Sequence, residues 1–225
     1  MRIDILSAVP QLMHSAFAHS ILQRAQQQEI IDIRLHKLHD FSTQKNNQID
    51  DYQYGGGSGM VMMIEPIMNC LAHIETQSKP DEIIYLTPDG ELLEQQTCNQ
   101  LSLKKHLVLL AGHYKGVDER LRKHIITKEI SIGSYVLSGG ELPAAVLVDA
   151  VCRLIPGVMN DGTSALTDSF QDGLLAPPVY TRPETFNDWQ VPKVLLSGNF
   201  KLIDAWREEQ ALQRTKERRP DLLSD

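Results

Sequence analysis

Cysteine is scarce in this chain and follows no pattern. The 225 residues include three cysteines, Cys70, Cys98 and Cys152. An odd number of widely spaced thiols makes neither a disulfide framework nor a zinc motif, so we expect reduced cysteines in a cytoplasmic protein. The histidines form no His-Glu-x-x-His motif, and His36 and His39 lie in a polar stretch typical of a solvated surface. The sequence therefore predicts no metal site.

Long apolar runs and excess positive charge are lacking too. No run of about 18 apolar residues is present, so no membrane-spanning helix is expected. The N-terminus has neither the basic head nor the apolar segment of a secretory signal. The net charge is −7, which argues against a broad basic face for nucleic acid. DNA is not expected as a partner, and an RNA partner would need a local basic patch.

Apolar runs that alternate with helical patterns predict an α/β domain. Strands are expected at 3–9, 31–35, 82–87, 106–111 and 130–137. Helices are expected from Pro10 to Ile21, from Pro66 to Ile74 and over 143–155. Strands of this length, separated by helices, favour a mainly parallel sheet. We therefore assign residues 1–158 to one domain of this class.

The C-terminal part has a different composition. Residues 159–173 are rich in Gly, Asp, Ser and Thr without an apolar period, and predict an interdomain linker. Residues 174–225 predict a small helical domain. Its main helix would carry Leu202, Ile203, Trp206 and Leu212 on an apolar face and end before Pro220.

Three of the expected strands end in turns. The turns are Pro88-Asp-Gly90, Gly112-His-Tyr-Lys-Gly116 and the pair Gly139-Gly140. Adjacent glycines predict a backbone with φ > 0 that can come close to a ligand. Pro143 suits the first turn of a helix. Because such a junction presents backbone N–H groups, it predicts a ligand site.

Common nucleotide-binding signatures do not account for these loops. A Rossmann dehydrogenase would carry Gly-x-Gly-x-x-Gly after its first strand, and a P-loop protein would carry Gly-x-x-x-x-Gly-Lys-Ser/Thr. Neither motif is present. The glycines lie instead in the second half of the α/β domain.

Several longer motifs stand in a fixed order along nearly the whole chain. They are Asp50-Asp-Tyr-Gln-Tyr-Gly-Gly-Gly-Ser-Gly-Met60, Gly112-x-Tyr-x-Gly-Val-Asp-Glu-Arg120, Ser131-Ile-Gly-x-Tyr-Val-Leu-Ser-Gly-Gly-Glu-Leu-Pro143, Arg153-Leu-Ile-Pro-Gly157, Asp168-Ser-Phe170, Tyr180-Thr-Arg-Pro183, Val194-Leu-Leu-Ser-Gly-Asn199 and Arg218-Arg-Pro-Asp-Leu-Leu223. With these motifs the chain resembles the bacterial tRNA (guanine-N1)-methyltransferases of the trefoil-knotted SPOUT class, the TrmD family. The resemblance implies a trefoil-knotted α/β methyltransferase domain with a mainly parallel sheet and a small helical C-terminal domain that binds tRNA.

The resemblance also implies S-adenosyl-L-methionine as the methyl donor, bound in a bent shape where the three loops converge. The residues that would bind it are Tyr85, Leu86, Gly112, Tyr114, Gly116, Ile132, Gly133, Ser134, Tyr135, Val136, Leu137, Gly139, Gly140 and Pro143. From the residues alone, any one of these loops could equally be a tight turn.

Methylation of guanine N1 requires removal of the N1 proton and stabilisation of charge on O6. The resemblance assigns the base to Asp168 and the O6 partner to Arg153. It names as target the guanosine immediately 3′ of the anticodon (guanosine-37), and it implies a homodimer with the active site at the subunit interface. Considered without the family, Asp168 could cap a helix and Arg153 could form an interfacial ion pair.

The tRNA anticodon stem-loop is the implied partner. Its candidate contacts are Gly56, Gly57, Ser58, Gly59, Lys115, Arg182 and Arg214. Each could equally belong to a flexible turn or a solvated face. Lys115 stands where the family has glutamate, Ser134 where it often has aspartate, and Gln53 where it often has proline. A magnesium requirement stays open, as do a related methyltransferase with another RNA target and a non-catalytic RNA-binding module.

Overall fold

The N-terminal part of the chain is built on one parallel sheet. A computed structural model describes residues 1–159 and 168–223, in two compact units, Met1–Asn160 and Asp161–Asp225. Five strands of the first unit pair in the order β2-β1-β6-β5-β7. Their bounds are Arg2–Ser7 (β1), Asp32–Lys37 (β2), Glu82–Leu92 (β5), His106–Ala111 (β6) and Lys128–Ser131 (β7). All these pairs are parallel, which confirms the predicted fold class; the trefoil knot stays a prediction.

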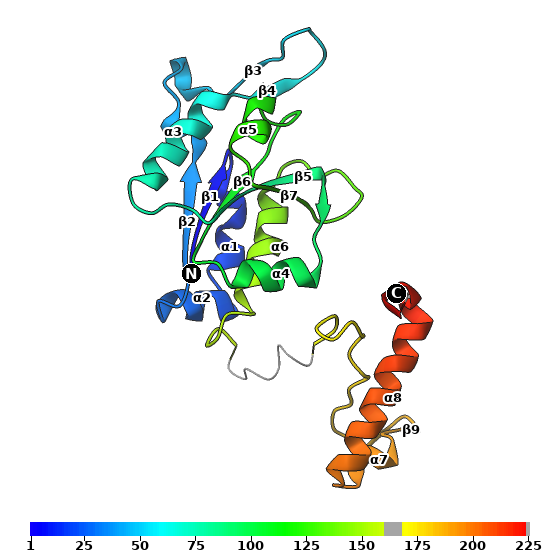
Figure 1. Ribbon diagram of the computed structural model, residues 1–225. Helices are drawn as coiled ribbons and strands as arrows, with labels where there is room; N and C mark the ends of the chain where they lie inside the picture. Colours follow the sequence, from blue (N-terminus) through cyan, green and yellow to red (C-terminus); the bar gives the residue numbers. More distant parts are fainter. Residues whose placement is uncertain (160–167, 224–225) are drawn as a thin grey trace. The chain divides into compact units, whose positions relative to one another are not determined.

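Helices cover both faces of this sheet (Figure 1). One face carries η1 (Pro10–Met13), α1 (His14–Phe17), α2 (Ser20–Gln27), α4 (Gln95–Ser102) and α6 (Glu141–Cys152). The other carries η2 (Leu38–Phe41), α3 (Ile64–Glu75) and α5 (Glu119–His124), with η3 (Lys45–Asn47) beside η2. Along β6, Leu107 and Leu109 pack on the first face and Val108 and Leu110 on the second. Burial on both faces explains why this strand is a continuous apolar run.

A buried charged cluster joins three neighbouring strands. The Asp4 carboxylate on β1 is fully buried. It accepts hydrogen bonds from Arg2 Nε (2.6 Å) and Nη2 (3.1 Å), and pairs with Nε2 of His36 on β2 (2.6 Å) and of His106 on β6 (2.7 Å). Burial opposes ionisation, but the hydrogen bonds from His36, Arg2 and His106 hold the pKa of Asp4 well below its usual range. One carboxylate thus fastens β1 to both of its partners.

Several predicted elements have different bounds in the structure. β5 continues through the predicted turn Pro88-Asp-Gly90 to Leu92, with a shift of register there. The helix expected from Pro10 to Ile21 is broken: α1 ends at Phe17, and α2 begins at Ser20, which takes a left-handed conformation (φ 57°). The strand expected over 130–137 ends at Ser131. Gly133 has φ 153° there, and the chain leaves the sheet as an exposed loop.

A short hairpin was missed in the sequence. β3 (Asp50–Tyr52) and β4 (Met60–Met62) pair antiparallel, and the triple-glycine run lies in the loop between them. β4 is also bonded to the loop after β6: Lys115 N donates to Met60 O and Met62 N to Gly116 O, both at 2.9 Å. The glycine-rich loop is therefore tied to the second of the three strand-end loops.

The C-terminal unit is small and mainly helical. It contains β8 (Thr185–Phe186), β9 (Trp189–Gln190), α7 (Lys193–Leu196), α8 (Phe200–Arg218) and η5 (Pro220–Leu223). Asn199 caps α8 through its side chain, and the helix ends before Pro220 as predicted. Its buried residues are Ile203, Ala211 and Thr215, whereas Leu202 and Leu212 are exposed, so the predicted apolar face is wrong at these two positions.

Part of the predicted linker, 160–167, lies outside the described residues, and 168–173 contain neither helix nor strand. In the ranges 1–159 and 168–223, no helix combines the length and apolarity that a membrane span requires.

Candidate functional site

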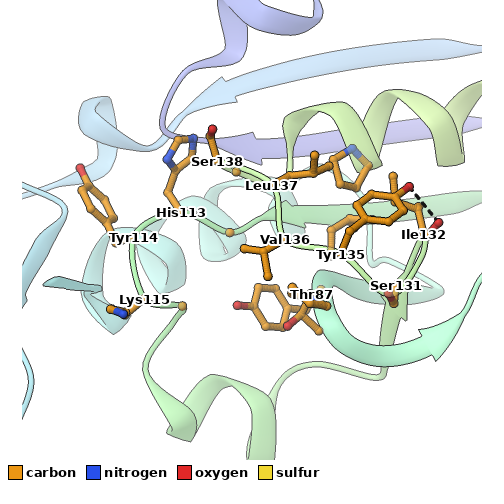
Figure 2. Close-up of a pocket in the computed structure, with 18 of the residues that line it drawn as sticks. Thr87, His113, Tyr114, Lys115, Ser131, Ile132, Tyr135, Val136, Leu137 and Ser138 are labelled. Carbon is orange, nitrogen blue, oxygen red and sulfur yellow. Dashed lines mark hydrogen bonds between the residues drawn. The ribbon is translucent and has the colours of Figure 1, made fainter. Parts of the chain in front are cut away.

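A cavity of about 630 Å³ lies at the carboxyl ends of β5, β6 and β7. The loops after these three strands form most of its wall, with Gly59 and Met60 of the hairpin and Pro143 of α6 completing it. Figure 2 shows residues from all three loops that line this cavity. This is the edge of a parallel sheet at which open α/β folds bind ligands, and the volume suits a molecule of cofactor size.

The first loop is held by Arg122 of α5. Its guanidinium makes two hydrogen bonds to Glu129 (2.8 and 2.6 Å) and one to Asp89 (2.8 Å), and lies 5.7 Å from the ring centre of Tyr85. Hydrogen bonds from Thr87 and Arg122 hold the pKa of Asp89 below its usual value. Burial raises the pKa of the Tyr85 hydroxyl. Ionic contacts outside the cavity thus shape the Pro88-Asp-Gly90 turn, around which the β5–β7 pairing shifts register.

The third loop folds back on itself. Tyr135 N donates to Gly133 O (2.9 Å), and the Tyr135 hydroxyl donates to Ile132 O (3.2 Å), which Figure 2 shows as a dashed line. Tyr135 is 54% exposed and Val136 83% exposed, although both line the cavity. The loop therefore presents apolar side chains to a ligand on one side and to solvent on the other.

The glycine pair allows two loops to approach closely, and it does not adopt a left-handed backbone conformation. Neither Gly139 nor Gly140 has φ > 0, so that part of the sequence interpretation was wrong. A Cβ on Gly140 would lie 2.7 Å from both Ala111 Cα and Gly112 N. Gly140 N donates to Gly112 O at 2.7 Å. The third loop thus lies directly on the start of the second, with no room for a side chain between them.

The structure gathers nearly all of the predicted cofactor residues around this cavity. Ser134 is the exception, since it does not line the wall. Of the predicted substrate residues, Gly59 and Lys115 line the same cavity, whereas Gly56, Gly57 and Ser58 lie on the exposed hairpin loop. The sequence missed Met60, Thr87, Pro88, His113, Ile130, Ser131 and Ser138 as lining residues. Thr87 is the last residue of the predicted strand and Pro88 directly follows it, and this position could have identified them.

Lys115 is the one side chain with a permanent charge among the described residues that line the cavity. Its stem packs over Gly59, where a Cβ would lie 2.8 Å from Lys115 Cγ. The described part of the chain contains no group of three or more His, Cys, Asp or Glu side chains that could hold a metal ion. The cavity therefore offers a ligand mainly apolar side chains and backbone groups, with one permanent positive charge at Lys115.

The two predicted catalytic residues belong to different units. Arg153 is half-buried and follows the last residue of α6, and its N–H donates to Asp149 O (3.2 Å). Twelve residues of α6 separate it from Gly140, a distance along the helix of about 18 Å. Asp168, also half-buried, is the first described residue of the C-terminal unit. The cavity in the N-terminal unit is thus formed without Arg153 in its wall.

Comparison with known proteins assigns the family. The model of the family described as tRNA (Guanine-1)-methyltransferase TrmD matches residues 1–225. The chain belongs to the TrmD family. It is 59% identical to the tRNA (guanine-N(1)-)-methyltransferase of Christiangramia forsetii over all of both chains. It is 58% identical to that of Cytophaga hutchinsonii over 99% of this chain and 94% of the relative, and 52% identical to that of Bacteroides fragilis over all of both.

Within this TrmD-family chain, the predicted RNA-contacting cations of the C-terminal unit differ in their surroundings. Arg182 is exposed and precedes Pro183 through a cis peptide bond. Arg214 is half-buried and its Nη1 donates to Ala176 O (3.3 Å), which leaves its other N–H groups for further contacts. Arg219 lies 5.6 Å from the ring centre of Phe170 and pairs with Asp221.

Proposed function

We propose that this chain transfers the methyl group of S-adenosyl-L-methionine to N1 of guanosine-37 in tRNA, the nucleoside 3′ of the anticodon. The whole-chain match to the TrmD family carries the proposal. The cavity at three strand ends supports it, because one ligand there would touch all three loops. The product is 1-methylguanosine, and the reaction belongs in the cytoplasm, where tRNA is used.

The chemistry needs placement and one proton transfer. The sulfonium is an activated methyl donor, so holding it in line with N1 supplies much of the rate. The S–CH₃ bond breaks as the N1–CH₃ bond forms, and the sulfur leaves as a neutral thioether. Asp168 takes the N1 proton, and Arg153 stabilises the negative charge that develops on O6.

We propose that the active protein is a homodimer with two composite sites. On α6 the nearest residue of the cavity wall is Pro143, ten residues before Arg153, a rise of about 15 Å that exceeds the length of one arginine side chain. A second copy that supplies Arg153 and Asp168 resolves this separation. An exposed apolar surface offers the contact: Leu12 on η1 is 58% exposed, and Leu142 and Val146 on α6 are 57% and 48% exposed. These side chains lie on two elements that pack together, because η1 contacts α6.

We assign tRNA binding to the hairpin loop and the C-terminal unit. Gly56, Gly57 and Ser58 are exposed next to the cavity wall formed by Gly59, which suits contact with the target nucleotide. Arg182 and Arg214 suit contacts to phosphates of the anticodon stem-loop. Lys115 faces the cavity with a positive charge, and we assign it to a phosphate next to the target guanosine.

Methyl transfer to defined transcripts tests the proposed function. Labelled S-adenosyl-L-methionine is incubated with wild-type protein and a tRNA transcript that carries guanosine at positions 36 and 37, and nucleosides are then separated. We expect 1-methylguanosine with this transcript and none when position 37 is adenosine. Asp168→Asn should lower the rate by at least about 100-fold, the contribution typical of general-base catalysis.

A matched control makes the same chemical change elsewhere in the C-terminal unit. Asp188→Asn is suitable because Asp188 is exposed in the turn between β8 and β9 with φ 64°, a conformation that asparagine tolerates. Its rate should stay within about twofold of wild type, as for a surface substitution. Wild-type protein that binds tRNA and cofactor without forming 1-methylguanosine would contradict the proposal and favour an RNA-binding module.

A further inference from the structure

Glu141 is a buried carboxylate beside the cavity whose role the sequence did not reveal. The residue begins α6 and is 1% exposed. Its Oε1 accepts a hydrogen bond from the Ser7 hydroxyl (2.6 Å), and its Oε2 lies 3.0 Å from His113 Nε2. An ionised carboxylate only accepts hydrogen bonds, so the His113 ring donates through Nε2. Three segments distant in sequence thus meet at one side chain: the end of β1, the loop after β6 and the start of α6.

The hydroxyl of the first partner, Ser7, both donates and accepts a hydrogen bond. It is completely buried, and its oxygen also accepts a hydrogen bond from Val9 N (2.9 Å). The hydroxyl proton is therefore directed at Glu141. Because β1 lies inside the sheet, this contact anchors the carboxylate to the rigid part of the fold.

The second partner, His113, belongs to the cavity wall. It stands in the loop Gly112–Gly116, which contains two glycines and Tyr114 with φ 60°. The loop backbone is fastened to β4 on one side, through Met60 and Met62. On the other side the His113 ring reaches Glu141, and the Gly112 carbonyl accepts from Gly140 N. The imidazole thus supplies the side-chain link between this loop and the sheet.

Gly139 covers this link from the cavity side. A Cβ on Gly139 would lie 2.4 Å from both Glu141 Oε2 and His113 Nε2. The third loop therefore passes directly over the hydrogen bond and shields it. The hydrogen bond between Glu141 and His113 therefore sets the distance between the second and third loops, and a cofactor that contacts both loops depends on this distance.

We propose that Glu141 is a positioning residue for the cofactor, which acts through His113 to hold the loop Gly112–Gly116 in its binding shape. The inference rests on the proposed function, because it takes S-adenosyl-L-methionine as the ligand. Glu141 itself does not line the cavity and takes no part in methyl transfer. A buried carboxylate that lost His113 would keep one acceptor oxygen unpaired, so the pair strongly favours the loop arrangement described above.

Cofactor binding without tRNA tests the inference directly. Full-length wild-type protein, His113→Asn and His113→Gln are titrated with S-adenosyl-L-methionine by calorimetry. Glutamine places an amide N–H near the position of Nε2, whereas asparagine is too short to reach Glu141. We expect the Kd to rise about tenfold for His113→Asn, equal to 1.4 kcal/mol, and to stay within about threefold for His113→Gln.

A third variant disrupts the hydrogen bond between His113 and Glu141 without removing either side chain. Gly139→Ala inserts a methyl group between Oε2 and Nε2, and should also raise the Kd about tenfold. His124→Asn, at an exposed position at the end of α5, is the matched control and should bind as wild type. In steady-state methylation the loss should appear in the KM for the cofactor rather than in the KM for tRNA or in kcat.

The outcomes separate this inference from the proposed function. If His113→Asn lowers thermal stability but binds the cofactor as tightly as wild type, the pair of Glu141 and His113 has only a structural role. This result would overturn the inference. Failure of the glutamine variant to recover binding would also contradict it. Wild-type protein that binds the cofactor but does not methylate tRNA would overturn the proposed function alone, and the affinity comparison would still decide the role of Glu141.

Discussion

Replacing Asp4 by asparagine should destabilise the N-terminal unit by about 3 kcal/mol. The carboxylate is completely buried and carries the hydrogen bonds of Arg2, His36 and His106 from three adjacent strands. Asparagine keeps one acceptor oxygen but turns two N–H donors toward a cluster of donors. The cost lies at the low end of the range for breaking a buried ion pair, because the shape of the side chain is retained.

Thermal unfolding followed by circular dichroism measures this effect. For a unit of this size, each kcal/mol shifts the midpoint by about 2–4 °C, so we expect a decrease of about 6–12 °C. Asp32→Asn is the matched control on the neighbouring strand, where Asp32 forms an exposed ion pair with Arg34. Such a surface pair contributes less than about 1 kcal/mol, and the control should shift the midpoint little.

The pH dependence follows from the direction of the pKa shift. The pKa of Asp4 in the folded protein lies below its ordinary value of 3.8. Ionised Asp4 therefore stabilises the folded state above that pH, and the stabilisation is lost as the pH falls through the folded pKa. The contribution of ionised Asp4 to the difference between wild type and Asp4→Asn should be present at neutral pH and shrink in acid below pH 3.8. An Asp4→Asn protein as stable as Asp32→Asn at neutral pH would refute the role assigned to the cluster.

Three further substitutions have definite expected results. Gly140→Ala places a Cβ 2.7 Å from the backbone of Ala111 and should lower the free energy of unfolding by about 1–3 kcal/mol, measured in urea. It should also weaken cofactor binding at least about tenfold by calorimetry, because two cavity loops are forced apart; normal binding would contradict the close packing. Leu142→Asp introduces a charge into the exposed apolar surface and should convert a dimer into an inactive monomer in sedimentation analysis, whereas an unchanged dimer would exclude this surface. Lys115→Glu should weaken tRNA binding about threefold to tenfold in low salt, with a smaller effect in high salt; equal affinities at both salt concentrations would exclude a phosphate contact.

The sheet could be predicted because strands that are buried on both faces appear in the sequence as continuous apolar runs. β6 is apolar at nearly every position, and the structure makes it the central strand. The broken helix could not be predicted, since it depends on one left-handed serine, Ser20, with no glycine to indicate it. The hairpin β3–β4 could not be predicted from the sequence either. Its strands of three residues each are too short to show a period, and β4 is also held by hydrogen bonds to a distant loop.

The candidate site was predicted as a set of loops, but the forces that hold the loops together were not. Glu141 looks from sequence like an acidic residue that favours a helix N-terminus. That it is buried against Ser7 and His113 depends on the strand order, which sequence patterns do not give. Arg122 is similar: on a helix it resembles a solvated cation, yet it binds two acidic side chains around the first loop.

The strand order has a consequence for how the chain acquires its fold during synthesis. β1 lies between β2 and β6, and Arg2 is paired with His106, more than one hundred residues later. At about 5–20 residues per second, the ribosome needs about 5–20 s to make that stretch. During this interval Ile3 and Ile5 have only the edge strand β2 beside them and no central strand to close the sheet. Formation of the sheet is therefore set by a long-range pairing, which predicts slow folding and a nascent chain that depends on chaperones until β6 emerges.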